Sequence, residues 1–145
     1  MFRAMTEADA RAVAAWRYPA EYAFYAADQD AGDLEELLDP ARWGREYFAA
    51  DRDGELAGFF VVKQRGEARE IGLGLRPDLT GRGLGAAFLE AGLRFAAPGP
   101  FVLHVAAFNR RAIKVYERAG FAATERYEHF TNGALHPFVR MDRPA

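Results

Sequence analysis

The order of the expected secondary-structure elements predicts an α/β (α+β) fold in a single domain. A helix and a strand hairpin come first, two strand–helix units follow, and a second hairpin ends the chain. This order combines alternating and segregated elements around one sheet. A chain of 145 residues suits one domain and can bury a real core, so residues 1–145 are expected to form one domain.

The first helix is expected over residues 7–16. Thr6 is a suitable N-cap, and Asp9 stands where a capping box places its acidic or amide partner. Residues 20–39 are acidic and aromatic, and they predict one or two short helices.

Three strands are expected next. Strands at 46–50 and 56–63 flank the segment 51–54, whose sequence Asp-Arg-Asp-Gly is a hairpin signal. A third strand runs over 69–75, and Pro77 ends it because proline has no amide for a ladder.

Two helices then alternate with a strand. The helix at 83–97 is apolar almost all round, which predicts packing on several sides. The apolar run at 101–106 predicts a strand that is buried on both faces. The helix at 110–119 is amphipathic and ends at Gly120.

The final hairpin consists of strands near 121–130 and 135–141 around the pair Asn132-Gly133. A two-residue turn places His129 opposite His136. Two such histidines could bind a metal, but no third ligand is evident, so no metal is expected and they are interpreted as surface or substrate-rim residues.

Composition excludes several classes of protein. The chain has no cysteine, which excludes disulfides and thiolate metal sites. The sequence has no signal-peptide core and no membrane-spanning stretch, so we expect a cytoplasmic protein with no membrane partner. The net charge of −2 gives no support to a nucleic-acid partner.

Charge is divided unevenly along the chain. Residues 1–60 carry six basic and thirteen acidic side chains, a net charge of −7, whereas residues 61–145 carry thirteen basic and eight acidic ones, a net charge of +5. Chance and solvated helix faces are one interpretation. The other is that the basic half binds an anion and the acidic half attracts a cation.

The glycine-rich segment 76–86 joins a strand to a helix and predicts a pyrophosphate site. Glycines let the backbone approach a ligand, the first turn of a helix offers unpaired amides, and Arg82 adds a cation. The alternative is that the glycines only allow close helix–strand packing. The Gly-Lys-Ser/Thr of a P-loop is absent, and a dinucleotide fingerprint is disfavoured because residues 76–80 separate the strand from Gly81.

Two motifs resemble the GCN5-related N-acetyltransferase (GNAT) superfamily. Segment 80–85, Thr-Gly-Arg-Gly-Leu-Gly, is similar to that superfamily's acyl-CoA pyrophosphate loop, although Thr80 stands where Gln or Arg is commoner. Segment 109–121 resembles its second motif, Asn-x-x-Ala-x-x-x-Tyr-x-x-x-Gly-Phe. Both motifs occur in the superfamily's order and spacing.

The resemblance implies a mixed sheet, flanked by helices and splayed open between two parallel strands, 69–75 and 101–106. It implies that acetyl-CoA, the acetyl donor, lies in that opening. The residues implied to bind it are Leu73, Gly74, Leu75, Thr80, Gly81, Arg82, Gly83, Leu84, Gly85, Ala86 and Asn109. Small members often form dimers, so a homodimer is also an option.

The strand before the loop agrees with this interpretation. Alternation puts Glu70, Gly72 and Gly74 on one face, where the two glycines leave a trough without side chains. Glycine weakens a strand, so a ligand that approaches the trough is a reason for its presence.

Acetyl transfer needs a neutral amine, a stabilised carbonyl oxygen and a proton for the leaving thiolate. The second motif implies that Tyr116 is the general acid, and an aromatic that packs with Ile113 is the alternative. His104, five residues before Asn109, lies where the ribosomal-protein N-terminal acetyltransferases of this superfamily carry a glutamate that acts as the general base. Glu70 lies where histone-type members place theirs. The alternatives are that His104 is a core histidine and that Glu70 is an exposed carboxylate at the strand end. A water relay without a single base is also open.

The acceptor side is the least defined part of the sequence. Glu21, Tyr22 and Tyr25 are the candidates to line a pocket for a cationic amine, and an aromatic core under a solvated acidic face is the alternative. The expected acceptor is a small-molecule or peptide amine. A non-catalytic acyl-CoA-binding module on the same fold is the alternative function, and the presence of Tyr116 and His104 favours catalysis.

Overall fold

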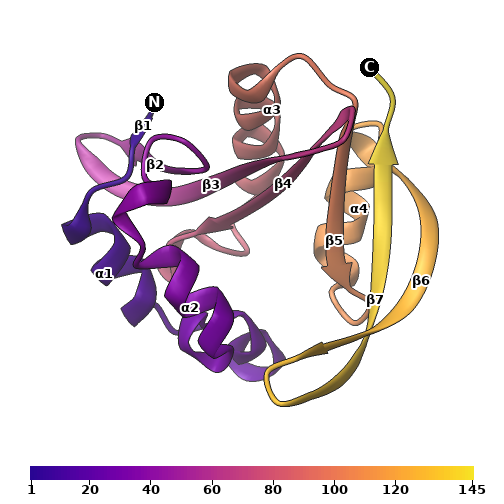
Figure 1. The fold of residues 1–145 in the computed structure, drawn as a ribbon, viewed down its shortest axis with the longest axis horizontal. Helices are drawn as coiled ribbons and strands as arrows, with labels where there is room; N and C mark the ends of the chain where they lie inside the picture. Colours follow the sequence, from indigo (N-terminus) through magenta and orange to yellow (C-terminus); the bar gives the residue numbers. More distant parts are fainter. The chain divides into compact units, whose positions relative to one another are not determined.

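Seven strands are hydrogen-bonded in the order β1-β2-β3-β4-β5-β7-β6, with parallel and antiparallel neighbours. This mixed α/β arrangement is the predicted fold class. The computed structural model describes residues 1–145 (Figure 1). The chain divides into two compact units, Met1–Val61 with Leu73–Thr80, and Val62–Gly72 with Gly81–Ala145. No helix combines the length and the apolar character needed to cross a membrane.

The first unit contains a strand, several helices and a hairpin. Its elements are β1 (Phe2–Ala4), α1 (Glu7–Ala15), η1 (Ala20–Tyr25), η2 (Ala27–Gln29), α2 (Ala31–Leu37), η3 (Pro40–Arg42), β2 (Tyr47–Arg52), most of β3 (Glu55–Arg65), the end of β4 (Ala68–Leu75) and η4 (Pro77–Leu79). The sequence did not predict β1, because three residues are too few to show a period. Helices α1 and α2 lie side by side in Figure 1.

The predicted capping box of α1 is present and is part of a wider network. Thr6 Oγ1 accepts from the Asp9 amide at 3.2 Å, and Asp9 Oδ2 accepts from the Thr6 amide at 2.9 Å. The buried Asp9 carboxylate also pairs with Arg3 at 2.6 Å, and Arg3 pairs with Asp51 at 2.6 Å. These bonds connect β1, α1 and β2.

Both predicted hairpins form with the expected turn geometry. Asp53 and Gly54 have φ of +54° and +79°, and Asn132 and Gly133 have φ of +51° and +79°. Positive φ at both central residues is typical of the type I′ turns that match strand twist. The second turn places His129 directly opposite His136, as predicted.

The second unit contains the remaining strands and two helices. Its elements are the end of β3, the first part of β4 and then α3 (Gly85–Ala96), β5 (Phe101–Ala106), α4 (Arg110–Arg118), β6 (Ala122–Thr131) and β7 (Ala134–Arg143). The parallel register between β4 and β5 covers only Arg69 with Phe101 and Glu70 with Val102.

Helix α3 differs from its prediction in two respects. It begins at Gly85 rather than at 83, because Gly83 has φ of +76° and cannot continue a right-handed helix. It also buries one face only, and Phe95 is 42% exposed. Some apolar residues of this helix therefore remain exposed to solvent.

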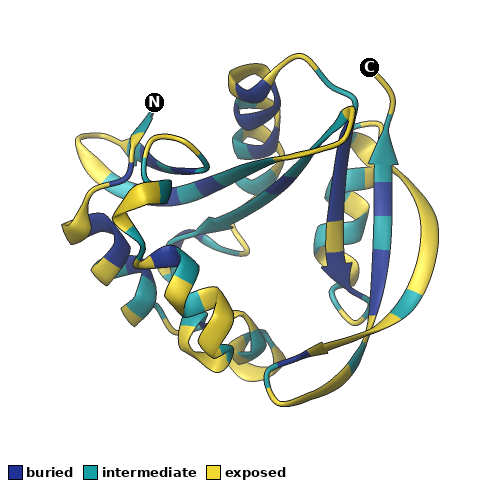
Figure 2. Cartoon of the chain, viewed as in Figure 1, coloured by how far each residue is buried: buried dark blue, intermediate teal, exposed yellow.

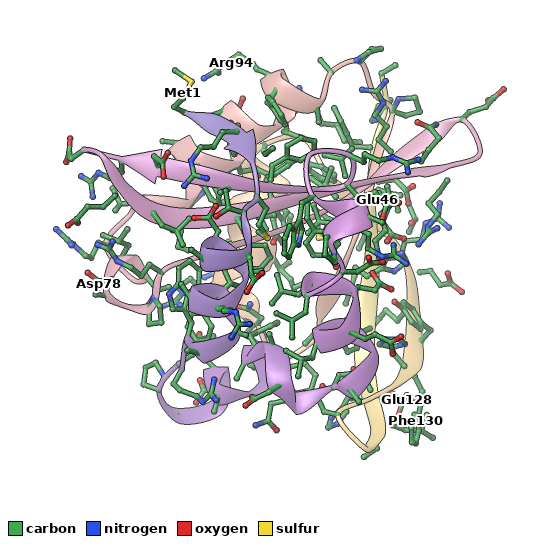
Figure 3. The ribbon with its side chains drawn as sticks, turned by 60° about the vertical axis from the view of Figure 1, so that its left-hand side comes forward. Met1, Glu46, Asp78, Arg94, Glu128 and Phe130 are labelled. Carbon is green, nitrogen blue, oxygen red and sulfur yellow. The ribbon has the colours of Figure 1, made fainter.

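Burial also differs between the strands of the second unit. Strand β5 is buried at every residue except His104, whereas β6 is exposed at nearly every residue (Figure 2). The exposed Glu128 and Phe130 project outward from β6 near the hairpin turn (Figure 3). The prediction that β5 is buried on both faces was thus wrong at His104, where polar side chains from neighbouring strands replace apolar contacts.

Candidate functional site

The chain that leads into the glycine loop is held by hydrogen bonds. The Arg76 amide donates to the Ala57 carbonyl at 2.7 Å, and Arg76 Nη1 donates to the Leu56 carbonyl at 2.8 Å. Thr80 Oγ1 donates to the Pro77 carbonyl at 2.7 Å. The loop therefore starts from a fixed backbone.

The loop itself has a backbone conformation that depends on glycine. Gly81 and Gly83 have φ of +71° and +76°, a region that favours glycine. No atom lies within 4 Å of the point that a Cβ on Gly83 would occupy, so the backbone there is open. Leu84 is the N-cap of α3 and provides no side-chain hydrogen bond, which leaves the first turn to other acceptors.

A cation that the sequence analysis missed lies against this loop. Arg111 Nη1 is 3.3 Å from the position of a Cβ on Gly81. Arg111 is an exposed residue of α4, and Arg82 in the loop is also exposed. The second motif contains Arg111, but only the fold shows that α4 brings it to the loop.

Asn109 is the N-cap of α4. Its Oδ1 accepts from the Ala112 amide at 3.1 Å, which satisfies a helix-end donor. The carboxamide therefore has a structural role, in addition to any contact with a ligand.

Tyr116 lies on the partly buried face of α4, as the amphipathic pattern predicted. Its ring makes an edge contact with Phe121, with centroids 6.1 Å apart. Ile113 is partly buried on the same face. The ring of Tyr116 thus packs on Phe121, and this packing is compatible with chemistry at the hydroxyl.

The two candidate bases, His104 and Glu70, lie next to each other. His104 Nε2 is 3.5 Å from Glu70 Oε1, and His104 Nδ1 is 2.7 Å from the Tyr127 hydroxyl. Arg65 Nε also lies 3.5 Å from Glu70 Oε1. We call Glu70, His104 and Tyr127 the polar cluster. Tyr127 was not among the sequence candidates, since only the β6–β7 register brings it to this face.

The environment sets the charge of the cluster. The hydrogen bond with His104 lowers the pKa of the Glu70 carboxyl, and the nearby Arg65 lowers it further, while partial burial opposes both. Burial raises the pKa of Tyr127, as do the charges of Glu125 and Glu70. At neutral pH the carboxylate is therefore charged and the phenol keeps its proton.

The trough predicted beside Gly74 is filled. A Cβ on Gly74 would lie 2.5 Å from Cε1 of Phe59, so the Phe59 ring covers this face. Phe59 in turn packs near Trp16, with centroids 6.3 Å apart. Glycine at 74 is thus explained by aromatic packing, and the prediction of a trough free of side chains is wrong at this residue.

The last carbonyl of β4 also has a protein partner. The Tyr18 hydroxyl donates to the Leu75 carbonyl at 2.8 Å. Burial raises the pKa of Tyr18 to about 12, so the phenol stays a donor. Leu73, like Leu75, is partly buried on the opposite face from Gly74.

The acceptor candidates lie on η1, where Glu21 is exposed, Tyr22 is partly buried and Tyr25 is 37% exposed. Tyr25 packs edge-on against Phe24, with centroids 5.4 Å apart. A hollow of about 270 Å³ in the first unit is lined by none of the three candidates but by Gly32, Glu35, Glu36, Asp39 and Arg42. No group of three or more His, Cys, Asp or Glu residues is arranged to hold a metal.

Comparison with known sequences identifies the family. The model of the acetyltransferase (GNAT) family matches residues 8–121. A mycothiol acetyltransferase of Streptomyces avermitilis is 40% identical over 114 residues, which cover 74% of this chain and 36% of the relative. One from Clavibacter michiganensis is 40% identical over 117 residues, covering 78% and 37%. The chain thus spans about a third of the length of these relatives.

Solved structures share the fold. A chimera of the spermidine N-acetyltransferase SpeG from Vibrio cholerae superposes with a TM-score of 0.78 at 21% identity, covering 99% of this chain and 93% of that one. A point mutant of SpeG gives a TM-score of 0.72 at 21% identity, covering 99% and 94%. Together with the match over residues 8–121, these findings show that the chain belongs to the acetyltransferase (GNAT) family.

Proposed function

We propose that this chain transfers an acetyl group from acetyl-CoA to a primary amine. Membership of the acetyltransferase family implies an acyl-CoA donor. The observation that carries the proposal is the loop in which Gly81 and Gly83 have positive φ and which opens into the uncapped first turn of α3. Such a turn binds phosphate through its amides and its dipole.

The loop residues fit the pyrophosphate of the donor. Backbone amides from Thr80 to Ala86 would hold its oxygens, and the side chains of Arg82 and Arg111 would add positive charge. When bound, the donor supplies an activated thioester. Contacts of Leu73, Gly74, Leu75 and Asn109 with the rest of the donor stay predictions.

The chain's own groups would then move two protons. The acceptor amine must lose a proton before it attacks, and the polar cluster is the proposed destination. His104 lies 2.7 Å from the Tyr127 hydroxyl and 3.5 Å from Glu70 Oε1, which supports a shared role. Tyr116 is the proposed donor of the proton that the leaving thiolate takes up.

The acceptor is defined only as an amine. The relatives are named mycothiol acetyltransferases, so mycothiol-related amines belong first in a panel of acceptors. Glu21, Tyr22 and Tyr25 stay predictions for the acceptor pocket, and the homodimer, the single domain and the cytoplasmic location stay predictions too.

Two measurements test the proposal against a non-catalytic acyl-CoA-binding module. Calorimetric titration of the protein with acetyl-CoA should show binding, and titration with NADPH should show none. Incubation with acetyl-CoA and the amine panel should then release free thiol. If acetyl-CoA binds but no amine in the panel causes release of the CoA thiol, the non-catalytic binding module is favoured. If acetyl-CoA does not bind, the proposal is overturned.

A further inference from the structure

His104 lies between two polar side chains that come from different strands. Tyr127 of β6 has its hydroxyl 2.7 Å from Nδ1, and Glu70 of β4 has its Oε1 3.5 Å from Nε2. The rings of His104 and Tyr127 are nearly perpendicular, at 87°, with centroids 5.7 Å apart. Both imidazole nitrogens therefore have a partner.

The chemistry of the partners decides where the imidazole proton lies. A carboxylate can only accept a hydrogen bond, so the nitrogen that faces Glu70 must carry the proton. The other nitrogen, Nδ1, then accepts, and the phenol of Tyr127 is the donor. The opposite tautomer would place an unprotonated Nε2 against a negative carboxylate. One arrangement thus satisfies all three groups, with Tyr127 donating to His104 and His104 donating to Glu70.

The sheet fixes this arrangement. In the antiparallel register Tyr127 is opposite Phe138, and its ring packs on Phe138 with centroids 6.1 Å apart. Phe138 is also opposite Ala106, two residues from His104, which puts Tyr127 and His104 on one face. The other charged groups that face the cluster are Arg65 of β3, Glu125 of β6, and Arg140 and Asp142 of β7.

A proton from outside has two routes into this cluster. It can reach the Glu70 carboxylate, whose pKa is lowered by His104 and Arg65 and which is therefore the weaker acceptor. It can instead reach the oxygen of Tyr127 while the phenol passes its own proton to Nδ1. The second route ends on an imidazole, a common general base, and the imidazolium that forms faces the Glu70 carboxylate on its far side.

We propose that Tyr127 is a further catalytic residue, whose hydroxyl passes the ammonium proton of the acceptor to Nδ1 of His104. The inference rests on the proposed acetyl transfer. The ammonium N–H bond and the original Tyr127 O–H bond break, and a new Tyr127 O–H bond and an Nδ1–H bond form. The amine keeps its electron pair, the phenol is regenerated, and the imidazolium faces the Glu70 carboxylate.

The first test needs no substrate. In ¹⁵N NMR of the free protein, the neutral His104 ring should show a protonated Nε2 and an unprotonated Nδ1. The variant Tyr127→Phe should keep a protonated Nε2, which still faces Glu70, and should shift the Nδ1 signal because that nitrogen loses its donor. Tyr47→Phe, which removes a hydroxyl bonded to Glu36 at 3.2 Å, should leave the His104 signals unchanged. A protonated Nδ1 in the neutral parent protein would overturn the hydrogen-bond assignment.

The second test uses acetyl-CoA and the amine of highest turnover in the panel. Tyr127→Phe should lower kcat about 100-fold at pH 7, with acetyl-CoA binding unchanged, and His104→Gln should lower it similarly. The kcat of the double variant should be little lower than that of either single variant, because both substitutions interrupt the same proton path. As the pH rises toward the pKa of the amine, free amine becomes abundant and the deficit of Tyr127→Phe should shrink.

Two outcomes separate the proposals. A parent enzyme that turns over while Tyr127→Phe keeps its full kcat at pH 7 overturns the role of Tyr127 and leaves the acetyltransferase intact. A parent protein that binds no acetyl-CoA overturns the proposed function itself, and the catalytic role of Tyr127 falls with it.

Discussion

At the residue scale, Tyr116 combines packing with proposed chemistry, and the two can be separated. The variant Tyr116→Phe keeps the ring that contacts Phe121 and removes only the hydroxyl. We expect kcat to fall about 100-fold or more, because the thiolate then leaves without its proton donor, while the Kd of acetyl-CoA stays the same. Thiol release measures the first quantity and calorimetry the second.

The outcome that contradicts this role is equally definite. Full turnover of Tyr116→Phe, at unchanged acetyl-CoA affinity, would leave Tyr116 with packing alone. Tyr47→Phe serves as the matched control, since it also loses one hydroxyl and should turn over like the parent protein.

The sequence identified individual residues better than it identified their partners. The resemblance to members of the superfamily indicated both His104 and Glu70, but as competing candidates for one role. Their contact, at 3.5 Å, depends on the short parallel register of β4 with β5. Tyr127 enters through the β6–β7 register, which a single sequence does not specify.

At the element scale, the glycine loop can be tested by adding one methyl group. Gly83→Ala places a Cβ at φ of +76°, at a strain of about 1–2 kcal/mol, in the segment proposed to hold the pyrophosphate. We expect at least tenfold weaker acetyl-CoA binding by calorimetry, because the backbone shifts or the methyl group obstructs the phosphate.

A matched control exists in the turn between β3 and β4. Gly66 has φ of +61° and, like Gly83, has no atom within 4 Å of the point that a Cβ would occupy, so Gly66→Ala carries a similar strain. Gly66→Ala should bind acetyl-CoA like the parent protein. Equal losses in both variants would attribute the effect to strain and contradict the loop assignment.

The network that joins β1, α1 and β2 should make stability depend on pH. The hydrogen bond with Arg3 lowers the pKa of both Asp9 and Asp51 in the folded state. Each carboxylate therefore stabilises the fold above its unfolded pKa of about 3.9, and this contribution is lost as the pH falls through the folded value. Urea unfolding should show the free energy of unfolding decreasing below about pH 4.

The variant Asp9→Asn tests the source of this dependence. It removes the charge that Arg3 contacts at 2.6 Å and one half of the capping box. We expect a loss of about 1–3 kcal/mol at pH 7 and a smaller dependence on acid. An unchanged acid dependence would show that other carboxylates control it.

Elements were predicted where caps and turns have clear signals, as at Thr6 and at the two Asx-Gly turns. They were predicted less well where tertiary packing decides. The apolar face of α3 stays partly exposed at Phe95, and β1 shows no period of its own. A single sequence shows the secondary-structure propensity and the hydrophobic pattern of each segment, whereas burial depends on which elements pack against one another.

At the scale of the whole molecule, the separation of charge predicts how salt affects the donor. The second part of the sequence, residues 61–145, has a net charge of +5, and Arg82 and Arg111 are exposed at the loop. Because exposed charges are screened by salt, the Kd of acetyl-CoA should rise about threefold or more between 50 and 500 mM NaCl. A salt-independent Kd would contradict an electrostatic contribution from these arginines.

The fold class was predictable because it depends on the order of the elements. The glycine-rich segment could be located because its motif is contiguous in sequence, and its role in binding the donor stays a prediction. The acceptor could not be predicted, since Glu21, Tyr22 and Tyr25 lie on a 3₁₀ helix that the sequence shows only as an aromatic, acidic stretch. The matched residues cover only 36% of the mycothiol acetyltransferase from Streptomyces avermitilis, so the activity of that relative is a guide to this protein and not a measure of it.

The packing of Phe59 on Gly74 also limits how this family can diversify. A side chain at 74 would meet the Phe59 ring at 2.5 Å, a distance that real carbon contacts do not reach. A side chain at 74 therefore requires the Phe59 ring to move aside or to be replaced by a smaller one, so the two positions should covary across an alignment of homologues. The constraint acts on residue 74, since a smaller side chain at 59 meets no such clash.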